Sequence, residues 1–405
     1  MTVLAEVERA ARTVCADGTD PAAVAAVLAW TCGPRRRSDA LRRRLRMEAA
    51  DASGGEEPTV ARPSERLSAL ARSDGRPGAP VLDVALHVLP QWTALGVRVA
   101  LVGDLAYPDD LAEGWPDVDA PPLLAWRGTP PGDAGPGVAL VGARNATAYG
   151  TAVAELLATA VARAGGRVVS GGAIGIDAAA HDAALGLPGG TTVVLGCGHA
   201  VRYPVPHARQ GGLFDRVLED GGTLVSELLP EVGAHPGVIR ARNRIVAGLA
   251  RVTVVVEGGS RSGALLTASA AADRGRDVLA VPGDLLAPGS AAPLKLLSEG
   301  ARACTGPRDV LALLPDLPVS LTAGGGLPAA GGVMTVPADL GMLPAPVREA
   351  LERAGPRGMA LEDLALVHDG PAGALLAALT RARLAGALDD VPGGVRLRPT
   401  RPSVS

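Results

Sequence analysis

Short apolar runs alternate with longer segments rich in alanine and leucine between residues 138 and 314. The runs fall at Val138–Val141, Arg167–Ser170, Thr191–Leu195, Thr223–Ser226, Val252–Val256 and Asp277–Val281. Continuous apolar runs indicate parallel strands that are buried on both faces of a sheet. With helices between them, they predict an α/β domain with an extended Rossmann-like, doubly wound and mostly parallel sheet. Ligands of such domains gather at the carboxyl ends of the strands.

The segments on either side of this block have other patterns. Residues 2–50 have apolar positions at helical spacing, and Val97–Val102 predicts a short strand. The segment 51–63 is polar and Pro/Gly-rich, which indicates a loop or linker. We expect a helical N-terminal region and lead-in at 1–127, the Rossmann-like domain at 128–314, a flexible linker at 315–342 and a winged-helix-like module at 343–405.

The last of these regions predicts three short helices followed by a hairpin. The helices are expected at Val347–Arg353, Leu361–Val367 and Ala372–Leu384, and the hairpin at Leu388–Leu397. This order is typical of a winged helix, although it also fits other small α+β modules.

Composition and charge bear on nucleic-acid binding, secretion and membrane insertion. The formal net charge of −3 gives no overall electrostatic case for nucleic-acid binding, so any such binding requires a local patch. The Arg-rich run at 35–46 is either a solvated face or a segment that steers DNA. We expect no signal peptide and no membrane span, because the N-terminus is acidic and no run of about 18 uncharged apolar residues occurs.

The cysteines are few and widely separated. They are Cys15, Cys32, Cys197 and Cys304, and none belongs to a C-x-x-C pair. This spacing disfavours a zinc site and favours a reduced, cytoplasmic protein. We therefore expect no bound metal.

Two loops of small residues follow the first two strands of the Rossmann-like domain. The first contains Gly142 and Arg144, and the second begins with Ser170, Gly171 and Gly172. Each opens a helix, where backbone N–H groups can bind a phosphate. The glycine spacing of a dinucleotide fingerprint, an acid at the end of the second strand and the lysine of a P-loop are all missing. We therefore expect phosphate binding without a nucleotide cofactor.

Arginines recur near two later strands. Arg242, Asn243 and Arg244 are expected at the start of the helix that leads into the strand at 252, and Arg261 and Ser262 follow that strand. Cations at a helix N-terminus oppose the macrodipole unless an anion binds, and guanidinium groups suit phosphate oxygens. These residues predict phosphate contacts, with a solvated, salt-bridged helix start as the alternative. Ser262 is also placed to cap the next helix.

Asp177 and His181 lie four residues apart on one expected helix. We expect a structural hydrogen bond between them, because no nucleophile or second acid accompanies them. The sequence therefore indicates no catalytic site.

Taken in order, the motifs resemble those of the DNA-processing protein A (DprA/Smf) family, in a version similar to that of actinobacterial members. The matching stretches are G-A-R-x-x-T-x-Y-G at 142–150, S-G-G-A-x-G-I-D-x-x-A-H at 170–181, R-N-R-I-V-A-G-L at 242–249, V-V-E with R-S-G-A-L within 255–265 and G-R-D-V-L-A-V-P-G at 275–283. The resemblance covers the whole α/β domain.

The resemblance implies a cytoplasmic protein that binds and protects single-stranded DNA. It further implies a homodimer formed through the core, interaction with the RecA recombinase and loading of RecA onto DNA in natural transformation and recombination. No catalytic activity and no cofactor are implied. Three segments depart from the family pattern: Ile174 stands where many relatives have Arg, Ile239–Arg240 replaces Phe-Pro, and Ser290–Leu296 lacks a Gly and an Asn.

Two other functions share parts of this pattern. A nucleotide-binding hydrolase of related architecture would use the same loops, but its P-G-G-x-G-T loop is missing. A transcription regulator would bind duplex DNA through the C-terminal module, where Thr380, Arg381 and Arg383 are the polar residues available on 372–384. Turnover of nucleoside monophosphates would favour the first, and preference for duplex DNA the second.

Overall fold

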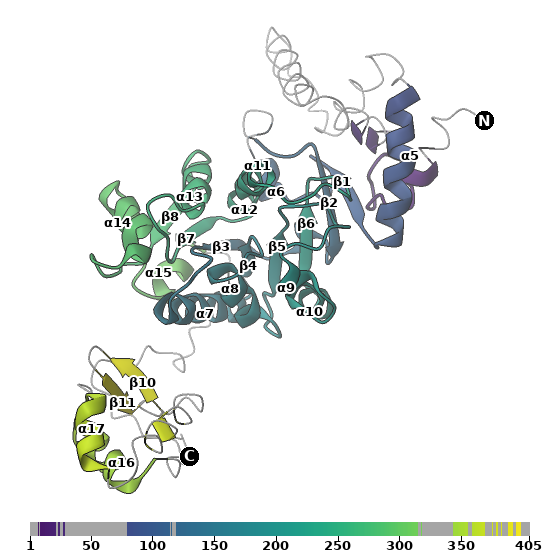
Figure 1. Cartoon of the computed structure of the whole chain (residues 1–405). Coiled ribbons are helices and arrows are strands. Elements are labelled where there is room, and N and C mark those ends of the chain that lie inside the picture. Colours follow the sequence, from purple (N-terminus) through teal and green to yellow (C-terminus); the bar gives the residue numbers. More distant parts are fainter. Residues whose placement is uncertain are drawn as a thin grey trace. The chain divides into compact units, whose positions relative to one another are not determined.

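The chain forms two compact units in a computed structural model, Met1–Ser320 and Leu321–Ser405 (Figure 1). The structure describes residues 79–113, 115, 119–314, 317, 343–354, 359–368, 388–391 and 394–397, together with positions within 7–28 and 375–382. The Arg-rich run at 35–46, the linker expected at 51–63 and most of the linker expected at 315–342 lie outside these residues.

Among the described residues of the first unit, nine strands form one sheet in the order β1-β2-β6-β5-β4-β3-β7-β8-β9. The strands are β1 Arg98–Leu101, β2 Leu123–Gly128, β3 Gly137–Val141, β4 Arg167–Ser170, β5 Thr191–Val194, β6 Thr223–Ser226, β7 Val252–Val255, β8 Asp277–Ala280 and β9 Arg302–Ala303. From β6 to β9 all neighbours pair in parallel, whereas β2 pairs antiparallel with β1 and β6. The mostly parallel α/β fold is thus confirmed.

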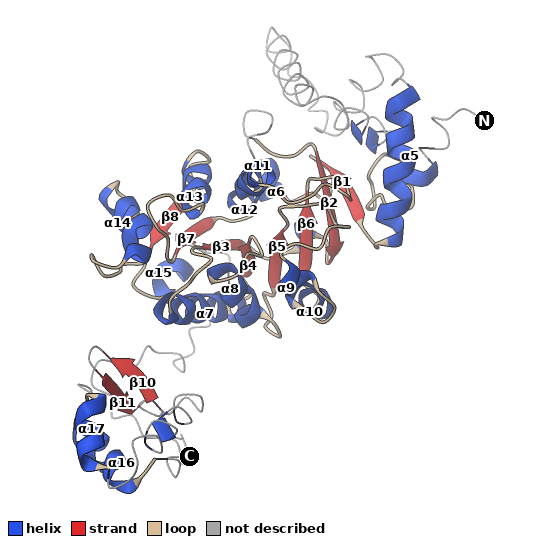
Figure 2. Cartoon of the chain, in the orientation of Figure 1, coloured by secondary structure: helices blue, strands red, loops and turns tan. Residues whose placement is uncertain are grey.

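Helices cover both faces of this sheet. The described helices of the unit are α5 Ala79–Ala94, α6 Asp109–Ala112, α7 Ala148–Arg163, α8 Ile176–Ala184, α9 Val205–Ala208, α10 Leu213–Glu219, α11 Pro236–Ala241, α12 Asn243–Gly248, α13 Ala264–Ala272, α14 Ala291–Ser298 and α15 Pro307–Leu311. Figure 2 shows α7 and α8 on one face of the sheet, with α12 and α13 on the other.

Strand β3 contributes side chains to both cores. Val138 and Leu140 pack in the cluster that includes α7 and α8, whereas Ala139 and Val141 pack in the cluster that includes α12 and α13. A strand covered on both faces is apolar at every position, which explains the continuous runs in the sequence.

The seven strands expected from apolar runs all form, with ends that differ by at most two residues. The apolar runs did not predict β2 or the two-residue β9. Because β2 begins directly after Pro121-Pro122 and only a short 3-10 helix, Pro131–Asp133, separates it from β3, it lacks the spacing of the other strands. Ala125 of β2 pairs with Ser226 of β6, so the sheet extends across the boundary that the sequence places at 127.

The chain changes direction along the sheet after β6. Strands β4, β5 and β6 follow β3 on one side, and the chain then returns to place β7 on the other side of β3. Loops that leave β3 and β7 therefore diverge at their carboxyl ends, which is where open α/β sheets bind ligands. The loops after β4 and β5 lie at the same edge.

The lead-in region packs against the edge strands of this sheet. Trp92, Tyr107 and Trp126 are among its largest fully buried side chains. The Tyr107 hydroxyl donates to the Pro121 carbonyl oxygen at 2.7 Å, and Cys15 forms a parallel bridge with Val99. In the described parts of the chain, no helix has both the length and the apolar character needed to cross a membrane.

The second unit has its own small core. It contains α16 Ala345–Ala354, α17 Leu361–Val367 and a hairpin of β10 Leu388–Val391 with β11 Gly394–Leu397. Buried Val347, Leu364, Leu379 and Val395 share one cluster. Two helices and the hairpin stand where the sequence places them, but the third expected helix is described at single positions only. The winged-helix assignment stays a prediction.

Candidate nucleic-acid interface

A carboxylate from the chain itself covers the N-terminus of α7. Glu257, at the end of β7, accepts the backbone N–H of Thr147 at 2.9 Å and the Thr147 hydroxyl. A Cβ at Gly150 would lie 2.3 Å from this carboxylate, so the helix approaches Glu257 closely. An anion at a helix N-terminus is favourable, and here Glu257 supplies it. Glu257 therefore occupies one backbone N–H at this helix N-terminus, that of Thr147.

The second loop holds an internal carboxylate in the same way. Asp177 Oδ2 accepts the N–H groups of Gly171 and Ala173, both at 3.2 Å. Burial raises the pKa of Asp177, while Arg242 and the two backbone donors oppose that rise. Two backbone N–H groups of this loop thus have a partner within the fold.

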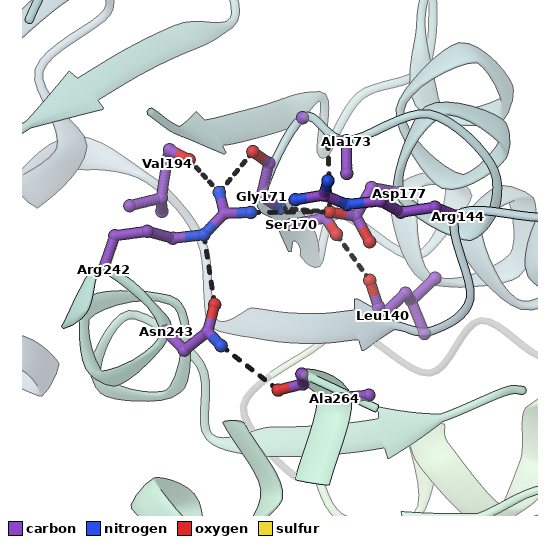
Figure 3. Close-up of polar contacts among 12 residues, drawn as sticks. Leu140, Arg144, Ser170, Gly171, Ala173, Asp177, Val194, Arg242, Asn243 and Ala264 are labelled. Atoms are coloured by element: carbon purple, nitrogen blue, oxygen red, sulfur yellow. Dashed lines mark hydrogen bonds and ion pairs between the residues drawn. The ribbon is translucent and has the colours of Figure 1, made fainter. Parts of the chain in front are cut away.

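Arg242 lies at the centre of this edge (Figure 3). Its Nη1 donates to the carbonyl oxygens of Gly171 and Val194, and its Nη2 lies 3.9 Å from Asp177 Oδ2. The side chain is buried between the ends of β4 and β5. Burial lowers the pKa of this guanidinium, Asp177 raises it, and nearby Arg144 lowers it further. Arg242 therefore joins the loops instead of projecting into solvent.

Two glycines make room for this arrangement. A Cβ at Gly171 would lie 1.9 Å from the Arg242 guanidinium, so no side chain fits there. Gly172 has φ +69°, and its Cβ would meet Val193 and Phe214. The S-G-G sequence is thus required by the packing of the loop, and Ser170 faces inward, donating to the Leu140 carbonyl oxygen at 2.6 Å.

The R-N-R motif opens α12, the helix that leads into β7, as the sequence predicted, with Arg242 at its N-cap. Helix α11 already runs from Pro236, and Arg242 lies at the junction between α11 and α12. Asn243 accepts from Arg242 Nε and donates to the Gly263 carbonyl oxygen, both at 3.1 Å. Asn243 therefore connects the junction to the loop before α13.

Arg244 is committed to two carboxylates. Its two terminal nitrogens lie 2.7 and 2.6 Å from the two Glu227 oxygens, and its Nε lies 3.0 Å from Asp119. Burial would lower the pKa of this guanidinium, but Glu227 and Asp119 raise it above its ordinary value. The charge of Arg244 is consequently neutralised within the fold.

Two of the expected arginines project from this edge. Arg144, after β3, and Arg261, after β7, have exposed side chains. Arg144 Nη1 lies 3.5 Å from the Tyr203 hydroxyl, and Figure 3 shows its side chain reaching over the loop of Gly171. Beside Arg261, Ser262 accepts the N–H of Ala264, the first residue of α13, at 3.2 Å, although Gly263 and not Ser262 is the N-cap of that helix.

Sequence reasoning missed one basic residue of this edge and misjudged one pair. Arg202 is exposed on the loop after β5, next to Tyr203, where the family-like Tyr-Pro pair could have drawn attention to it. The expected hydrogen bond between Asp177 and His181 is wrong. Asp177 accepts a hydrogen bond from the Gly171 N–H in the loop before its helix, whereas His181 Nδ1 lies 2.6 Å from Thr191 Oγ1. That hydroxyl belongs to the neighbouring strand β5. The spacing of residues within one helix cannot predict a contact with another element.

This chain is similar to several known proteins. The model of a family described as DNA recombination-mediator protein A matches residues 98–315. Protein Smf of Escherichia coli is 36% identical over 270 residues, which cover 64% of this chain and 68% of that protein. A putative DNA processing protein DprA of Mycobacterium tuberculosis is 45% identical over 173 residues, which cover 43% of each protein.

A solved structure shares the arrangement of elements. The X-ray structure of DNA processing protein A from Streptococcus pneumoniae matches with a TM-score of 0.51 and 30% sequence identity. The match covers 66% of this chain and 90% of that one. The chain thus spans most of the solved structure, about two thirds of the Escherichia coli relative and less than half of the Mycobacterium tuberculosis relative.

Proposed function

The chain belongs to the DNA recombination-mediator protein A family, and we propose that it binds single-stranded DNA along the carboxyl edge of its sheet. The observation that carries this proposal is the pair of exposed arginines, Arg144 and Arg261, on the two loops that diverge at β3 and β7. Guanidinium groups bind phosphate oxygens, and exposed cations keep that capacity.

The ten residues expected at the interface then divide into two groups. Arg144 and Arg261 contact the phosphates, and exposed Arg202 joins them. The other eight shape the edge through contacts within the fold: Gly142, Ser170, Gly171, Gly172, Arg242, Asn243, Arg244 and Ser262. Their role in DNA binding is to hold the exposed arginines at fixed positions.

Stacking adds little to binding at this edge. Tyr149, at the start of α7, is 53% exposed, and the Tyr203 side chain is half-buried against Arg144. Aromatic stacking contributes roughly 1–3 kcal/mol per base where it occurs. We therefore propose binding that is mainly electrostatic and strongly dependent on salt.

We propose binding without a chemical step. The carboxylates at the edge, Glu257 and Asp177, are both buried and both accept hydrogen bonds from backbone N–H groups. Neither is available to take a proton from a substrate. Glu257 also covers the helix N-terminus that a nucleotide phosphate would need, which disfavours the nucleotide-binding hydrolase.

We further propose a cytoplasmic homodimer that delivers single strands to the RecA recombinase, with the small second unit as a winged-helix-like module. Family membership as a recombination mediator supports this proposal. Assembly of RecA on single-stranded DNA should accelerate when the chain is present, and the molar mass in solution should be that of two chains.

A titration with fluorescently labelled oligonucleotides tests the binding proposal. Single-stranded and duplex forms of one sequence are titrated at two salt concentrations, with anisotropy as the readout. We expect single strands to bind at least tenfold more tightly and the affinity to fall steeply with salt. Equal or tighter binding of the duplex would overturn the proposal and favour a duplex-DNA regulator.

A further inference from the structure

We propose that this chain binds a small oxyanion, a phosphate or carboxylate compound, at Arg167 in a cavity on the opposite edge of the sheet. The cavity has a volume of about 210 Å³ and lies at the amino ends of the parallel strands. Arg167 begins β4, whose other end, Ser170, belongs to the DNA edge. The two sites are therefore separated by the length of a strand.

Arg167 is a buried cation with few partners. Its exposed fraction is 9%, and its Nη1 has one long hydrogen bond of 3.4 Å to the Thr191 carbonyl oxygen. Its Nε is buried and contacts no acceptor among the described residues. Burial lowers the pKa of this guanidinium, and no carboxylate of the described residues opposes that effect. A buried charge without a counter-ion is costly, which sets Arg167 apart.

Two other buried or partly buried guanidinium groups have carboxylate partners from the chain. Arg242 has Asp177, and Arg244 has Glu227 and Asp119. At the cavity itself, Asp110 lies 3.3 Å from Arg251 and is engaged there. Within the described part of the chain, no carboxylate oxygen lies within 4.0 Å of the Arg167 guanidinium. The missing counter-ion is therefore one that a ligand can supply.

The walls of the cavity restrict the kind of ligand. The lining is more polar than apolar: Arg167 and Arg251 contribute positive charges, Asp109 and Asp110 negative ones, and prolines and Leu249 the apolar part. A guanidinium fork matches the paired oxygens of a phosphate or a carboxylate. The volume far exceeds that of one water molecule, which needs about 10–15 Å³ on this measure. A small oxyanion that binds the Arg167 guanidinium suits these features.

Thermal unfolding of the full chain tests this site. Inorganic phosphate and acetate are titrated separately, with sodium chloride added to keep the ionic strength constant. We expect at least one anion to raise the unfolding temperature in a saturable manner, by roughly 5 °C at a hundredfold excess over its Kd. Phosphate alone would identify a phosphate ligand, and acetate alone a carboxylate ligand. No saturable rise with either anion would overturn the proposal.

Three variants assign the effect to Arg167. Arg167→Leu should lose the rise, yet unfold at no lower temperature than the wild type without anion, since an unpaired buried cation has been removed. Arg167→Lys keeps the charge but loses the fork, and should bind at least tenfold more weakly. Arg144→Ala/Arg261→Ala, which alters the DNA edge, should keep the full rise. An undiminished rise in both Arg167 variants, or its loss in Arg144→Ala/Arg261→Ala, would contradict the proposed site.

Discussion

The guanidinium of Arg242 and the carboxylate of Asp177 lie 3.9 Å apart, and both side chains are more than nine-tenths buried. They come from different segments, and each also bonds the loop after β4: Arg242 through the Gly171 carbonyl oxygen and Asp177 through the Gly171 N–H. One peptide segment is thereby held from two sides. We expect the rigidity of the carboxyl edge of the sheet to depend on this pair.

Removing one member of this pair should destabilise the protein strongly. Arg242→Met leaves the Asp177 carboxylate buried without its cation, so we expect the free energy of unfolding to fall by about 3–5 kcal/mol. Denaturant titration measures this loss. The double variant Arg242→Met/Asp177→Asn should recover part of it, because no buried charge remains. Equal losses in the single and double variants would show that the ion pair is unimportant.

A methyl group at Gly171 should disrupt the DNA edge. The added Cβ would lie 1.9 Å from the Arg242 guanidinium and displace it. We expect Gly171→Ala to weaken single-strand binding at least tenfold in an anisotropy titration. Gly233→Ala is the matched control, because a Cβ there meets nothing within 4 Å. Similar affinities for the two variants would contradict a shaping role for Gly171.

The Glu257 carboxylate at the N-terminus of α7 should contribute measurably to the stability of the protein. Glu257→Gln keeps the shape but removes the charge that faces the helix N-terminus, so we expect a loss of about 1–2 kcal/mol in the free energy of unfolding. Glu299→Gln is the control, because Glu299 is exposed at the C-terminal end of α14 and pairs with Lys295 on the surface. Its expected effect is below about 0.5 kcal/mol. Reversed magnitudes would refute the proposed role of Glu257.

Acid should destabilise the protein through two buried histidines. Burial lowers the pKa of His181 to about 3 and that of His199 to about 4, from 6.5. The unfolded chain binds protons below pH 6.5 while these native side chains stay neutral, so stability is lost as the pH falls from 6.5 toward 4. At pH 4.5 each histidine should cost about 2–3 kcal/mol.

Denaturant titrations across this pH range measure the effect. His199→Gln removes one titrating group, so its free energy of unfolding should fall less steeply between pH 6.5 and 4.5 than that of the wild type. His87→Gln alters an exposed histidine and is the control. The same pH dependence in His199→Gln and the wild type would exclude a contribution from His199.

The sequence predicted the strands well because burial on both faces requires continuous apolar runs. It also directed attention to the loops of Arg144, Gly171 and Arg261, since small residues after a parallel strand mark the ligand edge. It could not show that Glu257 binds the α7 N-terminus. That contact depends on β7 lying beside β3, and strand order is not written in local spacing.

Local sequence patterns also could not predict which arginines are buried in ion pairs and which are exposed. Arg242 and Arg244 stand two positions apart, yet both are held by carboxylates that lie more than fifteen residues away in the sequence. Nothing in the local sequence distinguishes Arg144 from these two arginines, yet its side chain is exposed. Tertiary contacts therefore decide which guanidinium groups remain exposed to solvent.

The salt dependence of single-strand binding tests the central claim most directly. Anisotropy titrations compare the wild type, Arg144→Ala/Arg261→Ala and the control Arg163→Ala/Arg308→Ala, whose exposed arginines lie on α7 and α15. For the first variant we expect at least tenfold weaker binding and a plot of log affinity against log salt that is shallower by about 1.4, or about 0.7 per lost phosphate contact. The control should match the wild type. An unchanged slope in Arg144→Ala/Arg261→Ala would contradict the proposed interface.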